Sequence, residues 1–161
     1  QESKDGHFLL TTRRGSPDFY LTSSVFTNVY DNQKWNLSVR VKDGKYPYAS
    51  GLTGSDGTDN VTIEFAGYNV ELGVVRNEFS VSAQGLNDKH LTERRRYYAG
   101  ASRTDTTGTV VTKTDVRVSS VRHWAHYLEN PALLAHAKDP MNFGAEKANK
   151  NTNAKTQNTT T

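Results

Sequence analysis

Apolar and polar residues alternate in short runs along most of this chain. The clearest run covers 35–42, where the first, third, fifth and seventh residues are apolar and the others polar: Trp35, Asn36, Leu37, Ser38, Val39, Arg40, Val41 and Lys42. A strand with one face in a core and the other in water has this period of two. Further apolar or alternating runs of this kind cover 8–10, 19–21, 61–66, 70–76, 78–83, 97–101, 109–111 and 115–124. Strands this short and this closely spaced predict an all-β domain folded as a two-sheet antiparallel β-sandwich.

The alternation also predicts which side chains fill the space between the two sheets. We expect this interior to hold apolar residues from several strands: Leu37, Val39, Ile63, Phe65 and Val116. Trp35 and Trp124 sit on or beside apolar strand faces and are expected in the core. Arg40 lies on the opposite phase and is expected in water, and Asn77 is expected to join the runs 70–76 and 78–83.

The pattern changes after the last predicted strand. Asn130 can cap a helix that has Pro131 at its first position, and the residues up to Lys138 favour helix. Pro140 ends it, because the residue before a proline is pushed out of the helical region. From 145 to 161 no large apolar residue occurs, which predicts a disordered polar tail or linker. The expected organisation is therefore an N-terminal extension over 1–6, one domain over 7–144 and the tail over 145–161.

Composition narrows the classes of function. The chain has no cysteine, which excludes a disulfide framework, a thiolate metal site and a cysteine nucleophile. Part of the net charge of +3 comes from local clusters such as Arg94–Arg96 and from lysines of the tail, and the sequence has no dense basic stripe interleaved with aromatic residues. No apolar run reaches the roughly 18 residues of a membrane-spanning helix. We therefore expect neither nucleic-acid binding nor membrane insertion.

Several segments carry a family resemblance. They are Trp35 to Val39, Arg96 to Arg103, Gly108, Asp115 to Val118, Trp124 and the helix of Asn130 to His136. Together they resemble laminin-G-like domains of the concanavalin A-like jelly-roll group. The resemblance implies two curved antiparallel sheets that bind ligands on the concave face or at the rim loops. It also implies a binding or adhesion role, since glycan-binding lectins and adhesion modules are common members of that group.

Aromatic residues beside turns are the candidate ligand contacts. A tyrosine ring can stack on the apolar face of a sugar while neighbouring amide and carboxylate groups bond to its hydroxyls. The residues that fit this pattern are Tyr30, Asp31, Asn32, Tyr46, Tyr48, Tyr68 and Asn69. The alternative is that these tyrosines are partly buried strand residues.

Metal binding has two candidates. Asp56 and Asp59 lie in a Gly-, Ser- and Thr-rich loop and could supply oxygen ligands to calcium, although an ordinary turn explains the same residues. Calcium is the only cofactor that the sequence leaves open. A zinc site built from His123, His126 and His136 is weaker, because no acidic residue sits at a matching position.

Catalysis is not expected. Retaining glycoside hydrolysis needs two carboxyl groups about 5–5.5 Å apart, and Glu64 and Glu71 fall on different predicted strands. No serine occupies a Gly-x-Ser-x-Gly elbow.

The sequence thus predicts a non-catalytic binding or adhesion module of a larger secreted or virion-surface protein. Its expected partner is a glycan or a cell-surface protein, and its expected location is extracellular or on a virion. The alternative is a purely structural domain that packs against copies of itself, as a homo-oligomer, or against neighbouring virion subunits.

Overall fold

Strands dominate the structure of this chain, a computed structural model that describes residues 4–11, 19–43, 61–86, 102–103, 108–111, 116–124, 127–139 and 141. In chain order the elements are β1 (Leu9–Thr11), β2 (Tyr20–Thr22), β3 (Trp35–Asp43), β4 (Val61–Glu71), β5 (Val74–Leu86), β6 (Ser102–Arg103), β7 (Val110–Val111) and α2 (Asn130–Lys138). All strand pairs are antiparallel. The prediction of an all-β chain with one short helix near its C-terminus is therefore confirmed in the described residues.

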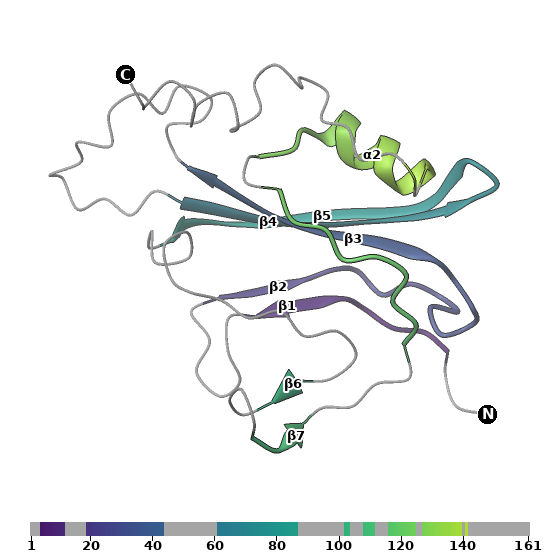
Figure 1. Ribbon diagram of the computed structural model, residues 1–161, viewed down its shortest axis with the longest axis horizontal. Coiled ribbons are helices and arrows are strands. Elements are labelled where there is room, and N and C mark those ends of the chain that lie inside the picture. Colours follow the sequence, from purple (N-terminus) through teal and green to yellow (C-terminus); the bar gives the residue numbers. More distant parts are fainter. Residues whose placement is uncertain are drawn as a thin grey trace, which may run out of the picture.

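The largest sheet has three strands in the order β3-β4-β5. Its register runs without a shift from Trp35 opposite Asn69 to Asp43 opposite Val61. β1 and β2 form a separate two-stranded sheet, and so do β6 and β7. Figure 1 shows three layers, with α2 above the central sheet and β1–β2 below it.

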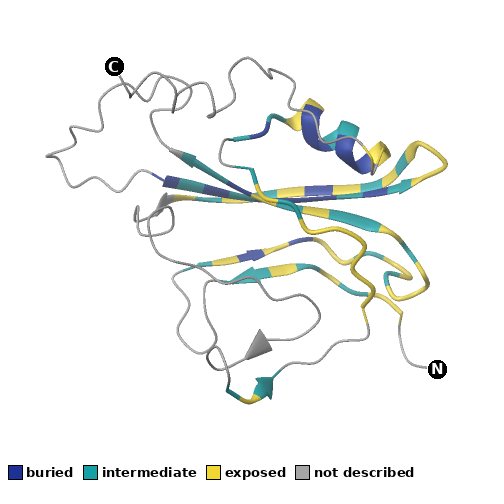
Figure 2. Cartoon of the chain, in the orientation of Figure 1, coloured by how far each residue is buried: buried dark blue, intermediate teal, exposed yellow. Residues whose placement is uncertain are grey.

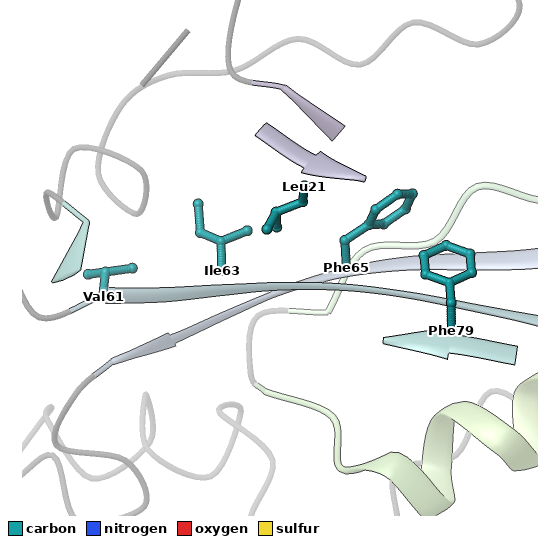
Figure 3. Close-up of a cluster of buried hydrophobic side chains, with 5 residues drawn as sticks. All are labelled: Leu21, Val61, Ile63, Phe65 and Phe79. Atoms are coloured by element: carbon teal, nitrogen blue, oxygen red, sulfur yellow. The ribbon is translucent and has the colours of Figure 1, made fainter. Parts of the chain in front are cut away.

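The face of the central sheet that lies toward β1–β2, here called the hairpin face, carries the main apolar core. Val61, Ile63 and Phe65 alternate along β4, Phe79 joins them from β5, and Leu21 of β2 packs against them (Figure 3). Burying a side chain of this size contributes about 1.5–3 kcal/mol. Phe8 adds to this core, with its ring 4.7 Å from that of Trp35 and stacked 5.4 Å from that of Phe79.

The predicted interior is only partly correct. Ile63 and Phe65 are buried, as expected, but Leu37 is 48% exposed, Val39 53% and Val116 57%. β1 and β2 are only three residues long, and β2 makes its contacts with β5 at the far side of the sheet. The edge strand β3 therefore keeps part of its apolar row in water.

The opposite face of the central sheet, here called the helix face, is covered by α2 over β3 and β4. Leu128, Ala132 and Leu133 form a second buried cluster against which Tyr68 and Trp124 pack. Figure 2 shows the buried side of α2 turned toward the sheet. Arg40, predicted in water, is 7% exposed beneath this layer. The prediction failed because α2 and the segment before it cover the helix face of β3, which the sequence pattern assigns to water.

Two strand boundaries also differ from the sequence prediction. The chain turns at Leu72 and Gly73 rather than at Asn77, which lies within β5 opposite Asn69. Gly73 adopts a φ of 79°, a conformation that glycine accepts at no steric cost. The expected strand over 115–124 is wrong for residues 116–124, which form no regular element and leave Val118 and Val121 exposed.

The helix is confirmed over Asn130–Lys138, with its first-turn proline, but Glu129 rather than Asn130 occupies the N-cap. Asp139, which precedes Pro140, is extended, as a residue before proline should be. The predicted strand over 97–101 and the predicted tail over 145–161 lie outside the described residues.

Candidate functional site

Two turns lie at the end of the central sheet where β3 begins. The first covers residues 27–32 and leads into β3, whose first residue Trp35 lies opposite Asn69. The second is Leu72-Gly73, which joins β4 to β5 just beyond that point. Both lie on the right of Figure 1. We call these two turns the rim.

The first turn is held in place by the N-terminal segment. The peptide groups of Gly6 and Phe26 exchange two hydrogen bonds of 3.0 and 2.8 Å, and the amide of Tyr30 donates to the carbonyl of Lys4 over 3.3 Å. The amide of Asn28 donates to Asp5 Oδ1 over 3.0 Å. Lys4 Nζ and Asp31 Oδ1 form an exposed ion pair at 2.8 Å. Residues 4–6, which the sequence places in an extension, thus fix the shape of this turn.

The Tyr30 ring is the most exposed aromatic group of this turn. It is 71% exposed, and one edge rests on Gly6. A Cβ atom at position 6 would stand 3.1 Å from Tyr30 Cε2 and 3.5 Å from its hydroxyl oxygen. Glycine therefore allows the close approach that supports the ring, and most of the ring surface stays open to solvent.

Backbone strain gathers at the rim. Among the described residues, positive φ outside glycine occurs at Asn28, Asn32 and Leu72. Asparagine tolerates this left-handed region, whereas a leucine pays roughly 1–2 kcal/mol. Leu72 is also 94% exposed, so no packing within the chain offsets this cost. Strained residues of this kind concentrate at functional sites.

The structure places the predicted ligand residues in three groups. Tyr30, Asp31 and Asn32 are all exposed and lie together in the first turn. Tyr68 faces the other way, packed against α2 on the helix face. Asn69 is buried, and its side-chain amide donates a 2.9 Å hydrogen bond to the carbonyl of Lys34.

Four further predicted residues lie outside the described residues. They are the tyrosines Tyr46 and Tyr48 and the calcium candidates Asp56 and Asp59. The calcium site therefore stays a prediction.

A second polar group of residues lies under α2. Arg40 and Glu64 stand opposite each other on β3 and β4, and Arg40 Nη2 lies 2.8 Å from Glu64 Oε2. Tyr127 donates its hydroxyl to the same Glu64 oxygen over 2.5 Å, and its ring lies under the Arg40 guanidinium at 4.9 Å. Arg40 Nη1 donates to the carbonyl of Leu128 over 2.9 Å. We call Arg40, which is buried, and the half-buried Glu64 and Tyr127 the triad.

The triad shifts the acidity of its tyrosine. Burial raises the pKa of Tyr127 well above its ordinary value, and the hydrogen bond to Glu64 raises it further, while Arg40 opposes the shift. Burial likewise raises the pKa of Tyr68, with a further rise from Glu78 and an opposing effect of Arg40. Both phenols stay protonated at neutral pH. Through the bonds from Arg40 to Leu128 and from Tyr127 to Glu64, the triad anchors the segment that leads into α2 on the sheet.

The two glutamates considered for glycoside hydrolysis lie on one strand, not on two as predicted. Glu64 and Glu71 both belong to β4, because the chain turns at Leu72 and not before it. They are seven positions apart along the strand, about 23 Å, which exceeds the distance between the two carboxyl groups in retaining and inverting glycosidases. Glu64 is committed to Arg40, and Glu71 accepts a 3.0 Å bond from Arg76.

The histidines considered for zinc do not form a cluster in the described part of the chain. His136 is buried on α2, where its ring stacks 5.0 Å from that of Trp124. His123 is exposed on the preceding segment, and His126 lies outside the described residues. No group of three metal-ligating side chains occurs among the residues that the structure describes.

Sequence reasoning missed Leu72 and the triad. The adjacent Gly73 is the signal that could have identified the turn, since a two-residue hairpin loop commonly ends in glycine. Arg40 carried no such signal, because its partners are 24 and 88 residues away along the chain.

No helix among the described residues is long and apolar enough to span a bilayer. Comparisons of the chain with protein-family models, with curated proteins and with solved structures give no match.

Proposed function

We propose that this chain is a non-catalytic binding module that recognises a glycan at the rim, with Tyr30 as the stacking platform. The observation that carries the proposal is the exposed Tyr30 ring, held on Gly6 by a turn that the N-terminal segment fixes. A preorganised aromatic side chain loses little conformational entropy on binding. Asp31 and Asn32 lie beside it and offer polar groups for sugar hydroxyls.

The finer fold and setting belong to the same proposal. The packing of β1–β2 on the hairpin face supports a two-sheet sandwich of the laminin-G-like jelly-roll type. Such a domain would serve a larger secreted or virion-surface protein, with an extracellular or virion location. Calcium at Asp56 and Asp59 would be an additional requirement for binding.

Affinity chromatography on immobilised cell-surface polysaccharides, backed by a glycan array, tests this proposal. Tyr30→Ala should weaken binding roughly 5- to 30-fold, because a stacked aromatic side chain contributes about 1–2 kcal/mol to the binding free energy. Tyr30→Phe should keep most of the affinity, since the ring face is retained. Tyr20→Ala is the matched control, because Tyr20 is a comparably exposed tyrosine on β2.

Two results would contradict the proposal. One is the absence of retention on every polysaccharide, both with calcium and with a chelator. The other is equal weakening by Tyr30→Ala and Tyr20→Ala, which would mean that the rim is not the contact.

A second candidate function is assembly of a surface layer or virion by packing of identical copies. The half-exposed Leu37 and Val39 favour it, because contiguous exposed apolar side chains commonly mark protein contacts. Light scattering over a concentration series tests it: a rise in mass with concentration supports assembly, and a constant monomer mass opposes it.

A further inference from the structure

The Leu72-Gly73 turn presents an apolar tip that nothing in the described chain covers. Leu72 is 94% exposed in a conformation that disfavours leucine, and the neighbouring Val74 is more than half exposed. Figure 2 shows this tip as an exposed end of the β4–β5 hairpin. An asparagine at position 72 would remove both the strain and the exposed apolar surface. A leucine here is understandable when a partner buries it.

The tip carries no unbalanced charge. Glu71 and Arg76 flank it and pair with each other at 3.0 Å. Docking of the tip would therefore desolvate a neutral group and leave no unpaired charge at the contact. This favours an uncharged apolar surface as the receiving site.

The same chain offers such a surface on β3. Leu37 and Val39 are about half exposed on the hairpin face, and we call these two residues the β3 strip. Their neighbours along that face of β3, Trp35 and Val41, are apolar and pack against the core. Across the sheet, Leu37 and Val39 stand opposite Gly67 and Phe65. The surroundings of the strip in the sheet are thus uncharged, as the neutral tip requires.

A copy cannot dock its own tip on its own strip. Leu37 lies opposite Gly67, and Leu72 follows Gly67 by five positions, about 17 Å of extended chain. The tip therefore reaches only the strip of another molecule. We call the tip the donor surface and the strip the acceptor surface; because they differ, a contact between two copies leaves one donor and one acceptor unused, and further copies can add head-to-tail.

We infer that this chain associates with itself head-to-tail, with the Leu72–Val74 tip of one copy packed on the Leu37–Val39 strip of the next. The inference rests on the assembly function proposed above and names the two surfaces that would carry that assembly. It does not depend on glycan binding. Each contact involves few side chains, so a single contact is weak, and association should appear at the upper end of a concentration series.

Sedimentation equilibrium of the wild-type chain over a concentration series tests the inference. The weight-average mass should rise with concentration, and the rise should persist at high salt, since salt screens the repulsion between chains of net charge +3. Leu72→Asn should abolish the rise by disabling the donor. Leu37→Thr combined with Val39→Thr should abolish it by disabling the acceptor, and Val39→Thr alone, which keeps the side-chain shape, should weaken it. Met141→Asn removes another well exposed apolar side chain and should leave it unchanged.

Mixing the two disabled variants is the decisive step. The double-threonine variant retains the tip and Leu72→Asn retains the strip, so an equimolar mixture should form a one-to-one complex that neither variant forms alone. Should the double variant fail to fold, Val39→Thr takes its place, and its mixture with Leu72→Asn should then reach a higher weight-average mass than either variant alone at the same total concentration. A mixture that stays monomeric would overturn the inference.

Other outcomes separate the inference from the assembly function. If wild type and Leu72→Asn associate equally, copies assemble through another surface, and only the head-to-tail contact is refuted. If wild type stays monomeric at every concentration, both the contact and the assembly function fail.

Discussion

Arg40 and Glu64 face each other across β3 and β4, and a 2.8 Å ion pair joins Arg40 Nη2 to Glu64 Oε2 beneath the layer formed by α2. Side chains of Arg40 and Glu64 are 7% and 19% exposed. Solvent screens the attraction between two such charges only weakly. Removing one of them is costly, because the other charge then stays buried without a partner. Arg40 also donates to the carbonyl of Leu128 and Glu64 accepts from Tyr127, so the pair holds the C-terminal segment on the sheet through these two bonds.

Glu64→Gln should lower the free energy of unfolding by roughly 3 kcal/mol, because it leaves the Arg40 guanidinium buried without a counter-charge. Urea unfolding followed by circular dichroism measures this loss. The double variant Arg40→Met, Glu64→Leu should recover only part of it: no buried charge remains, but the Tyr127 hydroxyl and the Leu128 carbonyl lose their partners. A single variant as stable as wild type would show that the pair is solvated in solution.

Tyr127 should make stability fall in alkaline solution. Its pKa is raised in the folded chain, so the folded state holds the phenolic proton more tightly than the unfolded state, whose tyrosine titrates near 10.0. The free energy of unfolding is then unaffected by this group below pH 10 and decreases as the pH rises above it.

Urea unfolding at pH 8 and at pH above about 10 checks this dependence. Tyr127→Phe should be less stable than wild type at pH 8 by about 1.5–3 kcal/mol, for the lost hydrogen bond to a charged acceptor, and should show a smaller alkaline decrease. Tyr20→Phe, at an exposed tyrosine, should follow wild type. An unchanged alkaline decrease in Tyr127→Phe would contradict the raised pKa.

The strands were predictable because their signal is local, whereas the covering layers were not. The period of two at 35–42 places β3 to within one residue of its observed bounds. It cannot say that a layer would bury Arg40 on the polar face while Leu37 stays half exposed on the apolar face. That outcome depends on α2, whose residues follow β3 by about ninety positions, and on the shortness of β1 and β2.

The rim was predictable only in part for the same reason. Aromatic and amide side chains in succession at 30–32 indicate a turn with binding chemistry. The hydrogen bonds of Lys4 and Asp5 that support this turn join residues more than twenty positions apart, so no local sequence pattern predicts them. Leu72 was missed because it lies in an apolar run from Val70 to Val75, and such a run resembles a continuous strand.

Gly67 should be intolerant of any side chain. A Cβ atom at this position would overlap the ring of Phe79 and touch Leu37 Cδ2 at 3.0 Å. Gly67→Ala should therefore destabilise the chain by about 1–3 kcal/mol through overpacking of the core.

A double-mutant cycle with Phe79→Leu measures whether this clash is the cause. The smaller leucine side chain vacates the space over position 67, so Gly67→Ala should cost less in that background, with a coupling of at least about 0.5 kcal/mol. Additive effects of the two substitutions would mean that backbone strain, and not Phe79, makes glycine necessary.

Leu72→Asn should raise the free energy of unfolding by about 0.5–1 kcal/mol. The residue has a φ of 50° and is followed by Gly73 at 79°, and asparagine followed by glycine is the preferred pair for a two-residue hairpin turn of this kind. Leu72→Val should move stability the other way, because a β-branched side chain tolerates positive φ poorly. Chemical unfolding of the three proteins at low concentration, where self-association is negligible, gives both values. The same Leu72→Asn change is expected to abolish head-to-tail association. A gain in stability together with a loss of association would therefore show that leucine is kept at this turn for a contact and not for the fold. A stability equal to or below that of wild type would show that Leu72 is not strained there.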